Sequence, residues 1–160
     1  MVVAFILLLF QITQPPQVVR GGDYEITVPH GWTSERTLNR SFNLTHTTGA
    51  SLRVLTSRST RNFRSYAQGV AENLANPLGF ETISTPQHFS NAEQEWYEYD
   101  IRGNRLTDHR RLLYRAIRTT TGLTEIIFEN SEERFETLLP EAMSIASSLK
   151  LVPRKVRVRQ

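Results

Sequence analysis

Glu98 and His109 are an acid and an imidazole that the sequence pattern places opposite each other. Two β-prone runs flank Gly103-Asn104, a dipeptide whose residues both tolerate the positive φ of a tight hairpin turn. Counting outward from that turn pairs Glu98 with His109, and Trp96 with Arg111, on one face of the hairpin. A carboxylate beside an imidazole can move a proton near neutral pH, and a guanidinium over an indole makes a cation–π contact.

This polar face of the hairpin is predicted to be a contact patch rather than an active site. A cross-strand ion pair contributes about 0.2–1 kcal/mol and is usually structural. Asp108 cannot complete a dyad with His109, because adjacent side chains of a strand point to opposite faces. In an alternative arrangement Trp96 lies under a helix and Arg111 snorkels past it. The opposite face is expected to form the spine of the sheet, with Tyr97, Tyr99, Ile101, Leu112 and Tyr114.

The rest of the sequence offers little for catalysis. The absence of cysteine excludes disulfides, thiolate metal sites and a cysteine nucleophile. The sequence lacks a phosphate-binding loop, a serine nucleophile elbow and a zinc-protease histidine pair. We therefore expect a protein that is not an enzyme and has no cofactor or metal. The alternative that remains is an enzyme or metal protein that uses Glu98, His109 and Arg111. The four histidines each stand alone in their segments: His30, His46, His88 and His109.

The positive charge of the chain is concentrated at its end. The 19 lysines and arginines exceed the 16 acidic residues by three. Removing the four bases of the C-terminal tail leaves 15 bases against 16 acids, a net charge of −1. A nucleic-acid-binding domain is usually basic over one of its own faces, so we expect no nucleic-acid partner. The tail is a candidate contact for anionic lipid or an acidic partner through Arg154, Lys155, Arg157 and Arg159.

The N-terminal region is expected to attach the protein to a membrane or direct its export. Residues 2–10 form an unbroken apolar run, and even eleven residues of helix would span only roughly 17 Å, shorter than a hydrocarbon core of about 30 Å. This length is typical of the apolar part of a secretory signal or anchor, with membrane association through residues 1–12. Residues 11–22 contain Pro-Pro and Gly-Gly and are predicted to be a tether. A first buried strand is the alternative for the apolar run. We expect an extracytoplasmic, exported or membrane-anchored protein.

Periodicity predicts one α+β domain over residues 23–151, followed by a basic tail at 152–160. Alternating apolar residues predict strands at 23–29, 41–46, 50–56, 80–89, 123–129 and in the hairpin. Apolar residues at spacings of three and four predict a helix over 60–76. A second helix either begins after Asn130 and kinks at Pro140 or begins at Pro140. Short connections favour a largely antiparallel sheet of six or seven strands with two helices packed on it.

Four local features resemble the PsbP-like and DcrB-like superfamily. They are the Tyr24–Trp32 stretch YEITVPHGW, the helix at 60–76, the aromatic strand at 95–99, and a last strand followed by a helix ending IASSL. The resemblance covers residues 23–151 and implies an α/β/α sandwich. It also implies an exported or membrane-tethered, non-enzymatic domain that binds or steadies other proteins. It supplies no catalytic residues.

Two functions follow from these observations as hypotheses. The first is a membrane-tethered or exported protein-binding and assembly module, with Trp96, Glu98, His109 and Arg111 in its contact surface. The second is a cytosolic chaperone or adaptor of the DcrB-like type, in which the apolar N-terminal run is not a membrane signal. Deleting that run separates the two hypotheses.

Overall fold

The computed structural model describes residues 15–35, 41–58, 61–76, 80–105 and 108–152. Within these ranges the chain forms eleven strands and two helices. The strands are β1 (Gln17–Gly21), β2 (Tyr24–Val28), β3 (Trp32–Glu35), β4 (Ser41–His46), β5 (Ser51–Ser57), β6 (Phe80–Ile83), β7 (Gln87–Ser90), β8 (Gln94–Arg105), β9 (Asp108–Thr119), β10 (Leu123–Ser131) and β11 (Lys150–Leu151). The helices are α1 (Phe63–Ala75) and α2 (Glu132–Ser147).

Eight strands form the main sheet. Their order is β3-β4-β5-β10-β9-β8-β6, and β7 also pairs with β8 beyond the end of β6. A smaller sheet has the order β1-β2-β11. Every strand pairing among the described residues is antiparallel. The two sheets hold more strands than the six or seven predicted, and the largely antiparallel arrangement is confirmed.

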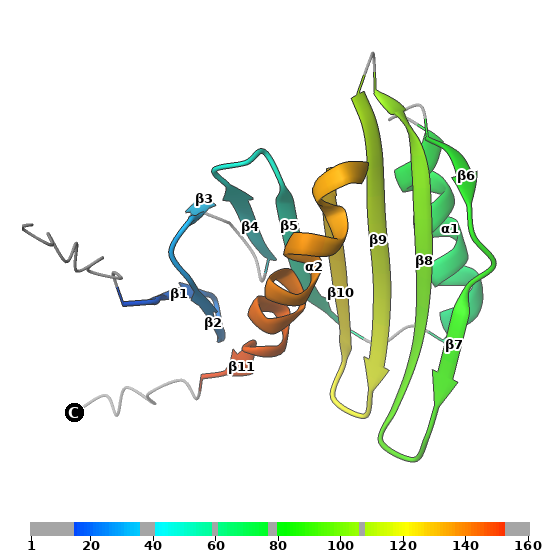
Figure 1. Cartoon of the computed structure of the whole chain (residues 1–160). Coiled ribbons are helices and arrows are strands. Elements are labelled where there is room, and N and C mark those ends of the chain that lie inside the picture. The colour runs from blue at the N-terminus through cyan, green and yellow to red at the C-terminus, as the bar shows by residue number, and fades with distance from the viewer. Residues whose placement is uncertain (1–14, 36–40, 59–60, 77–79, 106–107, 153–160) are drawn as a thin grey trace, which may run out of the picture.

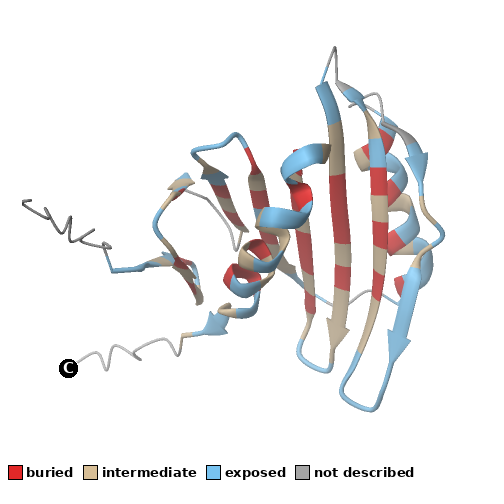
Figure 2. Ribbon diagram, viewed as in Figure 1, coloured by how far each residue is buried: buried red, intermediate tan, exposed pale blue. Residues whose placement is uncertain are grey.

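The two helices pack on opposite faces of the main sheet. In Figure 1, α2 lies in front of β10 and β5, and α1 lies behind β8 and β6. Burial follows this layering: red and paler residues alternate along β8 in Figure 2, because successive side chains point to opposite faces, and on β9 three successive residues are buried where both faces are covered. The predicted α/β/α sandwich is therefore confirmed as the architecture.

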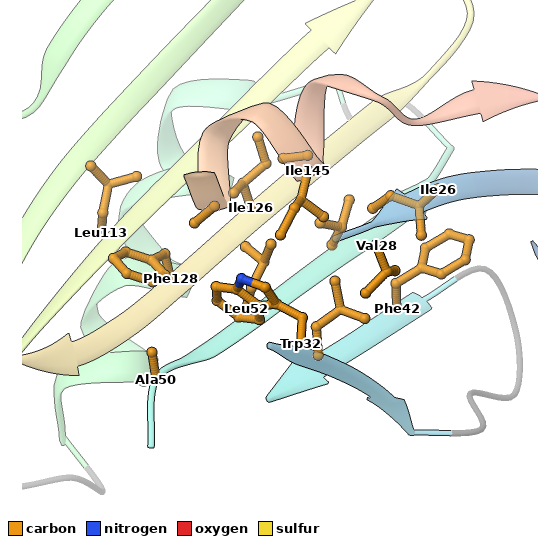
Figure 3. Packing of buried hydrophobic residues seen from close by; sticks show 14 of the residues in the cluster. Ile26, Val28, Trp32, Phe42, Ala50, Leu52, Leu113, Ile126, Phe128 and Ile145 are labelled. Atoms are coloured by element: carbon orange, nitrogen blue, oxygen red, sulfur yellow. The ribbon is translucent and has the colours of Figure 1, made fainter. Parts of the chain in front are cut away.

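Each helix covers its own hydrophobic cluster. On the α2 side, residues from both sheets converge, including Ile26 of β2, Phe42 of β4 and Phe128 of β10, all fully buried (Figure 3). On the α1 side, Phe63 and the alanine stripe of the helix pack against the tyrosines of β8 and β9. The alanines let α1 lie close to the sheet. They are Ala67, Ala71 and Ala75.

Part of the predicted tether belongs to the fold. Residues 17–21, expected to be a linker, form β1 and pair with β2 along its whole length. Gly22, at φ 63°, occupies the turn between them, where a left-handed conformation favours glycine. Val19 packs against the α2-side cluster, so burial of apolar surface stabilises this strand. The tether prediction is therefore wrong for residues 17–21.

The C-terminal helix resolves an alternative left by the sequence. α2 runs continuously from Glu132 through Pro140, so a start at Pro140 is wrong. Its N-cap is Ser131 rather than the predicted Asn130. The Asn130 side chain is buried, and its Oδ1 accepts a hydrogen bond from the Ser131 amide at 2.8 Å. Asn130 therefore hydrogen-bonds the backbone of the N-cap residue that follows it.

Candidate protein-binding surface

The pairing of β8 with β9 differs from the pairing predicted by the Gly103-Asn104 turn. Trp96 lies opposite Ile117 rather than Arg111, a shift of six residues, and Glu98 lies opposite Arg115. The ladder closes at Arg105 and Asp108, so the connection falls at residues 106–107, outside the described ranges. Gly103 is inside strand β8 and has no positive φ. The predicted turn and its cross-strand pairs are wrong.

The predicted patch residues nevertheless share one side of the two strands. A shift of six is even, and side chains of a strand alternate with period two, so each residue keeps its face. His109 lies opposite Asn104, six residues along β8 from Glu98, which corresponds to about 20 Å of strand. The acid–imidazole pair and the Trp96–Arg111 contact are therefore absent from this surface.

We call this side of β8 and β9 the open face and the opposite side the α1 face. The open face is bounded by α2 at one end and by the edge strand β7 at the other. Leu113 and Ile117 on this face pack with the α2-side cluster, and the remaining side chains that concern the candidate site are charged or aromatic and only partly buried. They are Trp96, Glu98, Asp100, Arg111 and Arg115.

Arg111 fastens the open face to α2. Its Nε and Nη2 donate to the two carboxylate oxygens of Asp100 at 2.9 and 2.8 Å, and Nη1 donates to Glu136 of α2. Its guanidinium carbon also lies 4.3 Å from the centre of the Phe135 ring. Burial would raise the pKa of Asp100, but hydrogen bonds from Arg111 and Arg102 outweigh it and lower the pKa below 3.8. Arg111 therefore has a structural role that the sequence did not reveal.

The exposed part of the open face is a stack of three side chains. Arg115 Nε donates to Glu98 Oε2 at 2.6 Å, and its guanidinium carbon lies 5.1 Å from the centre of the Trp96 ring. On the other side of Trp96, the Phe89 ring of β7 stacks at 5.7 Å with an interplanar angle of 18°. Phe89 is 40% exposed. Trp96 is therefore held between an aromatic ring and a guanidinium. Neither helix covers this part of the open face, since α2 lies over β10 and β5 and α1 lies on the other face (Figure 1).

Two members of this stack, Phe89 and Arg115, were not predicted as site residues. Arg115 was missed because the turn-based register placed it beyond the paired strands. Phe89 was assigned to a strand, but its neighbour across the ladder could not be read from spacing. With the observed register, the cation–π partner of Trp96 is Arg115 instead of Arg111.

The α1 face carries a buried carboxylate that the sequence analysis also missed. Glu125 of β10 is 7% exposed and accepts hydrogen bonds from the hydroxyls of Tyr114 at 2.8 Å and Tyr66 at 2.9 Å. Burial, together with the nearby charge of Glu125, raises the pKa of Tyr66 to about 12 and raises the pKa of Tyr114 further. Because Tyr66 belongs to α1 and the other two to the sheet, this cluster joins the helix to the strands.

The lower end of the α1 face holds a second small network. His88 of β7 stacks on Tyr97 at 4.4 Å, and its Nε2 lies 3.2 Å from Glu95 Oε1. Arg118 donates to the other oxygen of Glu95. Burial would raise the pKa of Glu95, but the hydrogen bonds from His88 and Arg118 lower it overall. Every polar group here is matched to a neighbour, as in a structural ion-pair network.

No three histidine, aspartate or glutamate side chains of the described residues are grouped as a metal site requires. Glu98, His109 and Arg111, the predicted enzymatic or metal-binding set, each contact different partners or lie far apart along the strands. The predicted Glu98–His109 pair is therefore not formed.

The two predicted terminal contacts lie outside the described residues. These are the apolar segment within residues 1–12 and the basic tail of Arg154, Lys155, Arg157 and Arg159. In the ranges that the structure describes, neither helix has the length and apolar composition needed to span a bilayer.

Several solved structures are similar to this chain. Mog1p, a Ran-binding protein of Saccharomyces cerevisiae, matches with a TM-score of 0.59 at 10% identity, over 86% of this chain and 95% of Mog1p. The cyanobacterial PsbP of Synechocystis sp. PCC 6803 matches with a TM-score of 0.56 at 15% identity, over 81% of this chain and 86% of that protein. LpqN of Mycobacterium tuberculosis, involved in cell envelope biogenesis, matches with a TM-score of 0.56 at 12% identity, over 88% and 87% of the two chains.

These matches extend over most of each chain, although the sequence identities are low. The sequence itself matches no family model and no curated protein sequence. The similarity therefore lies in the arrangement of the strands and helices. The chain has a PsbP-like fold, as the resemblance of its sequence indicated.

Proposed function

We propose that this protein is a non-enzymatic, exported or membrane-tethered module that binds and steadies other proteins. The observation that carries the proposal is the partly exposed Phe89–Trp96–Arg115 stack on the open face, in which Phe89 is the most exposed member. Tryptophan and arginine are the residue types most enriched at the energetic centres of protein interfaces. A sheet face with these side chains and no helix above it is a surface on which a partner can bury an apolar group.

The organisation of the charges supports binding more than catalysis. The arginines of the open face are held in fixed positions by Asp100 and Glu98, so little conformational entropy is lost when a partner contacts them. The similar structures include a Ran-binding protein and a protein involved in cell envelope biogenesis, which supports a protein partner and an envelope-related role as hypotheses. The membrane half of the proposal rests on the apolar run at residues 2–10.

Capture of partners by the full chain tests the binding half. The full chain and the double variant Trp96→Ala/Arg115→Ala are used as bait on membranes from the source cells. We expect the wild type to enrich specific proteins that the double variant does not retain. The control is Arg134→Ala, an exposed arginine on α2 away from the stack. Equal capture by the wild type and the double variant would show that the open face is not the contact surface.

Deletion of residues 1–14 tests the location. This deletion keeps β1, whereas a deletion to residue 20 would remove most of a strand of the small sheet. We expect the truncated protein to remain folded by circular dichroism and to leave the membrane fraction. A full-length protein found only in the cytosol, with intact Met1, would favour the chaperone or adaptor hypothesis instead.

A further inference from the structure

β7 is a short edge strand of the main sheet whose outer side is open among the described residues. It pairs with β8 on one side, and no other described strand pairs with its outer side. All four of its residues are exposed. An edge strand presents a row of backbone N–H and C=O groups that another extended chain can pair with.

The other edges of this sheet carry features that discourage such pairing. β6 has an irregular register between Phe80 and Thr82, and Pro86 separates it from β7. β3, at the opposite edge, ends in the charged Glu35. Proteins commonly protect edge strands with bulges, prolines and charges. The β7 sequence QHFS contains no proline and no acidic, lysine or arginine side chain, and its Phe89 is 40% exposed.

A groove lies beside this edge on the α1 face. Its volume is about 270 Å³, and its lining includes a base and an acid of α1, Arg64 and Glu72, together with Ile83, Pro86 and Tyr99. A strand added to β7 would send alternate side chains to the two faces of the sheet. Those on one face would meet this groove, and those on the other would meet Phe89 stacked on Trp96. Main-chain pairing with pockets for alternate side chains is a recurring mode of peptide recognition.

The exposed charge at the start of α1 is positive, whereas Glu72 lies about two turns further along the helix. Arg58, Arg61 and Arg64 are exposed near the start of α1 and form no ion pair with the described residues. The first turn of α1 contains no acidic residue, so the positive end of the helix dipole adds to their charge. Phe63, the first residue of α1, packs against Tyr97, which lies opposite His88 of β7. The helix start is therefore next to the edge.

The same charges argue against a second copy of this chain as the occupant. Two copies joined through antiparallel β7 strands would share one continuous sheet, with both α1 helices on the same face. Their arginine-rich starts would then lie near each other. Like charges brought together at an interface oppose association. A partner with carboxylates on the α1 side of the added strand is favoured instead.

We propose that β7 is a docking edge for an extended, acidic segment of a partner protein, which adds to the main sheet as a further strand. The inference rests on the proposed function, since it names the kind of segment that a protein-binding module of this form takes. The segment would alternate apolar residues, packed on Phe89 and Trp96, with acidic residues directed to Arg61 and Arg64.

Three synthetic peptides test this docking mode on the full chain. The first is a fluorescein-labelled ten-residue peptide that alternates valine with glutamate. The second has the same side chains and N-methyl groups on alternate peptide nitrogens, which remove backbone donors. The third has lysine in place of glutamate. By fluorescence anisotropy we expect saturable binding of the first peptide, weakened about tenfold or more in the other two. Equal binding of the first and second peptides would overturn strand addition.

Charge reversal provides a test on the protein side. The variant Arg61→Glu/Arg64→Glu should bind the lysine peptide more tightly than the glutamate peptide, and the matched control Arg134→Glu should keep the wild-type preference. Both variants change exposed residues, and circular dichroism checks their fold. An unchanged preference in the double variant would overturn the assignment of an acidic partner.

Two further results separate this inference from the proposed function. If the wild type captures its cellular partners through Trp96 and Arg115 but binds none of the peptides, the edge inference fails and the proposed function stands. If it binds the glutamate peptide but the Trp96→Ala/Arg115→Ala variant captures the same cellular proteins as the wild type, the open face fails as the contact surface and the edge inference stands. A stable dimer by light scattering that excludes the peptide would assign the edge to a second copy and overturn the inference.

Discussion

The two faces of β8 and β9 differ in burial and charge, although alternate residues of the same two strands form them. The α1 face is formed by buried tyrosines and aliphatic residues beneath a helix, with Tyr99 opposite Tyr114 and Ile101 opposite Leu112. The open face is formed by ion pairs and an exposed aromatic stack. One face therefore supplies stability and the other is available for contact. This separation means that substitutions on the open face can test binding with little loss of fold.

The largest expected effect is on the α1 face. Ile101 is fully buried between the sheet and α1, and Ile101→Ala should destabilise the protein by about 2–5 kcal/mol through lost burial and a cavity. The matched substitution on the other face, Glu98→Ala, removes one partly exposed ion pair and should cost about 1 kcal/mol or less. Urea unfolding measures both. Similar losses for the two variants would contradict the division of roles between the faces.

A smaller effect is expected in the tyrosine cluster. Tyr114→Phe leaves the buried Glu125 carboxylate without one of its two donors and should cost about 1–3 kcal/mol. Tyr66→Phe should cost less, because Tyr66 is less buried and water can reach the oxygen it leaves. Thermal unfolding of both variants checks the order. The reverse order would show that the helix contact, rather than the sheet contact, holds Glu125.

The two arginines of the open face should also differ from each other. Arg111→Ala removes the hydrogen bonds to Asp100 and Glu136 and the packing on Phe135, at a cost of about 1–2 kcal/mol. The Arg115 side chain is about twice as exposed as that of Arg111, so Arg115→Ala should cost about 1 kcal/mol or less. The binding loss should follow the opposite order, because Arg115 is part of the exposed stack. Chemical unfolding and peptide anisotropy on the same variants measure both quantities.

The smallest effect is a pH dependence that arises on the open face. Because the pKa of Asp100 is lower in the folded state than its ordinary 3.8, its ionised form stabilises the fold above that pH. The contribution is lost as the pH falls below 3.8 through the folded-state pKa. Asp100→Asn should therefore show a shallower fall in melting temperature on acidification than the wild type. Parallel acid profiles of the two proteins would mean that Asp100 is not held ionised by Arg111 and Arg102.

Much of the fold could be predicted because period-two patterns survive errors of register. The spine residues Tyr97, Tyr99 and Ile101 were placed on the correct face, since a shift by an even number of residues leaves each face intact. The turn itself was misplaced. Glycine-asparagine favours a hairpin turn, but that turn would set Tyr99 against Asp108. The observed ladder sets it against Tyr114, so the pairing of apolar side chains outweighs the local turn preference.

The candidate site was less predictable, because its contacts depend on tertiary neighbours. Phe89 reaches Trp96 from a strand on the outer side of β8, and Phe135 reaches Arg111 from a helix more than twenty residues later in the chain. Neither neighbour follows from spacing. Glu125 could have been suspected, since apolar residues occupy both faces of the strand predicted at 123–129, a pattern that indicates burial on both sides. Residues 17–21 were misassigned because the flanking Pro-Pro and Gly-Gly obscured a short strand with two valines.

The small sheet determines how this domain is presented to its surroundings. β1 and β11 both pair with the central strand β2, and the Val152 amide donates to the Asp23 carbonyl at 2.7 Å. Both ends of the folded part thus emerge on one side of the molecule, with β7 on the opposite side (Figure 1). A sensor chip, an affinity tag or a fused domain attached through either terminus will therefore leave the β7 edge and the open face accessible.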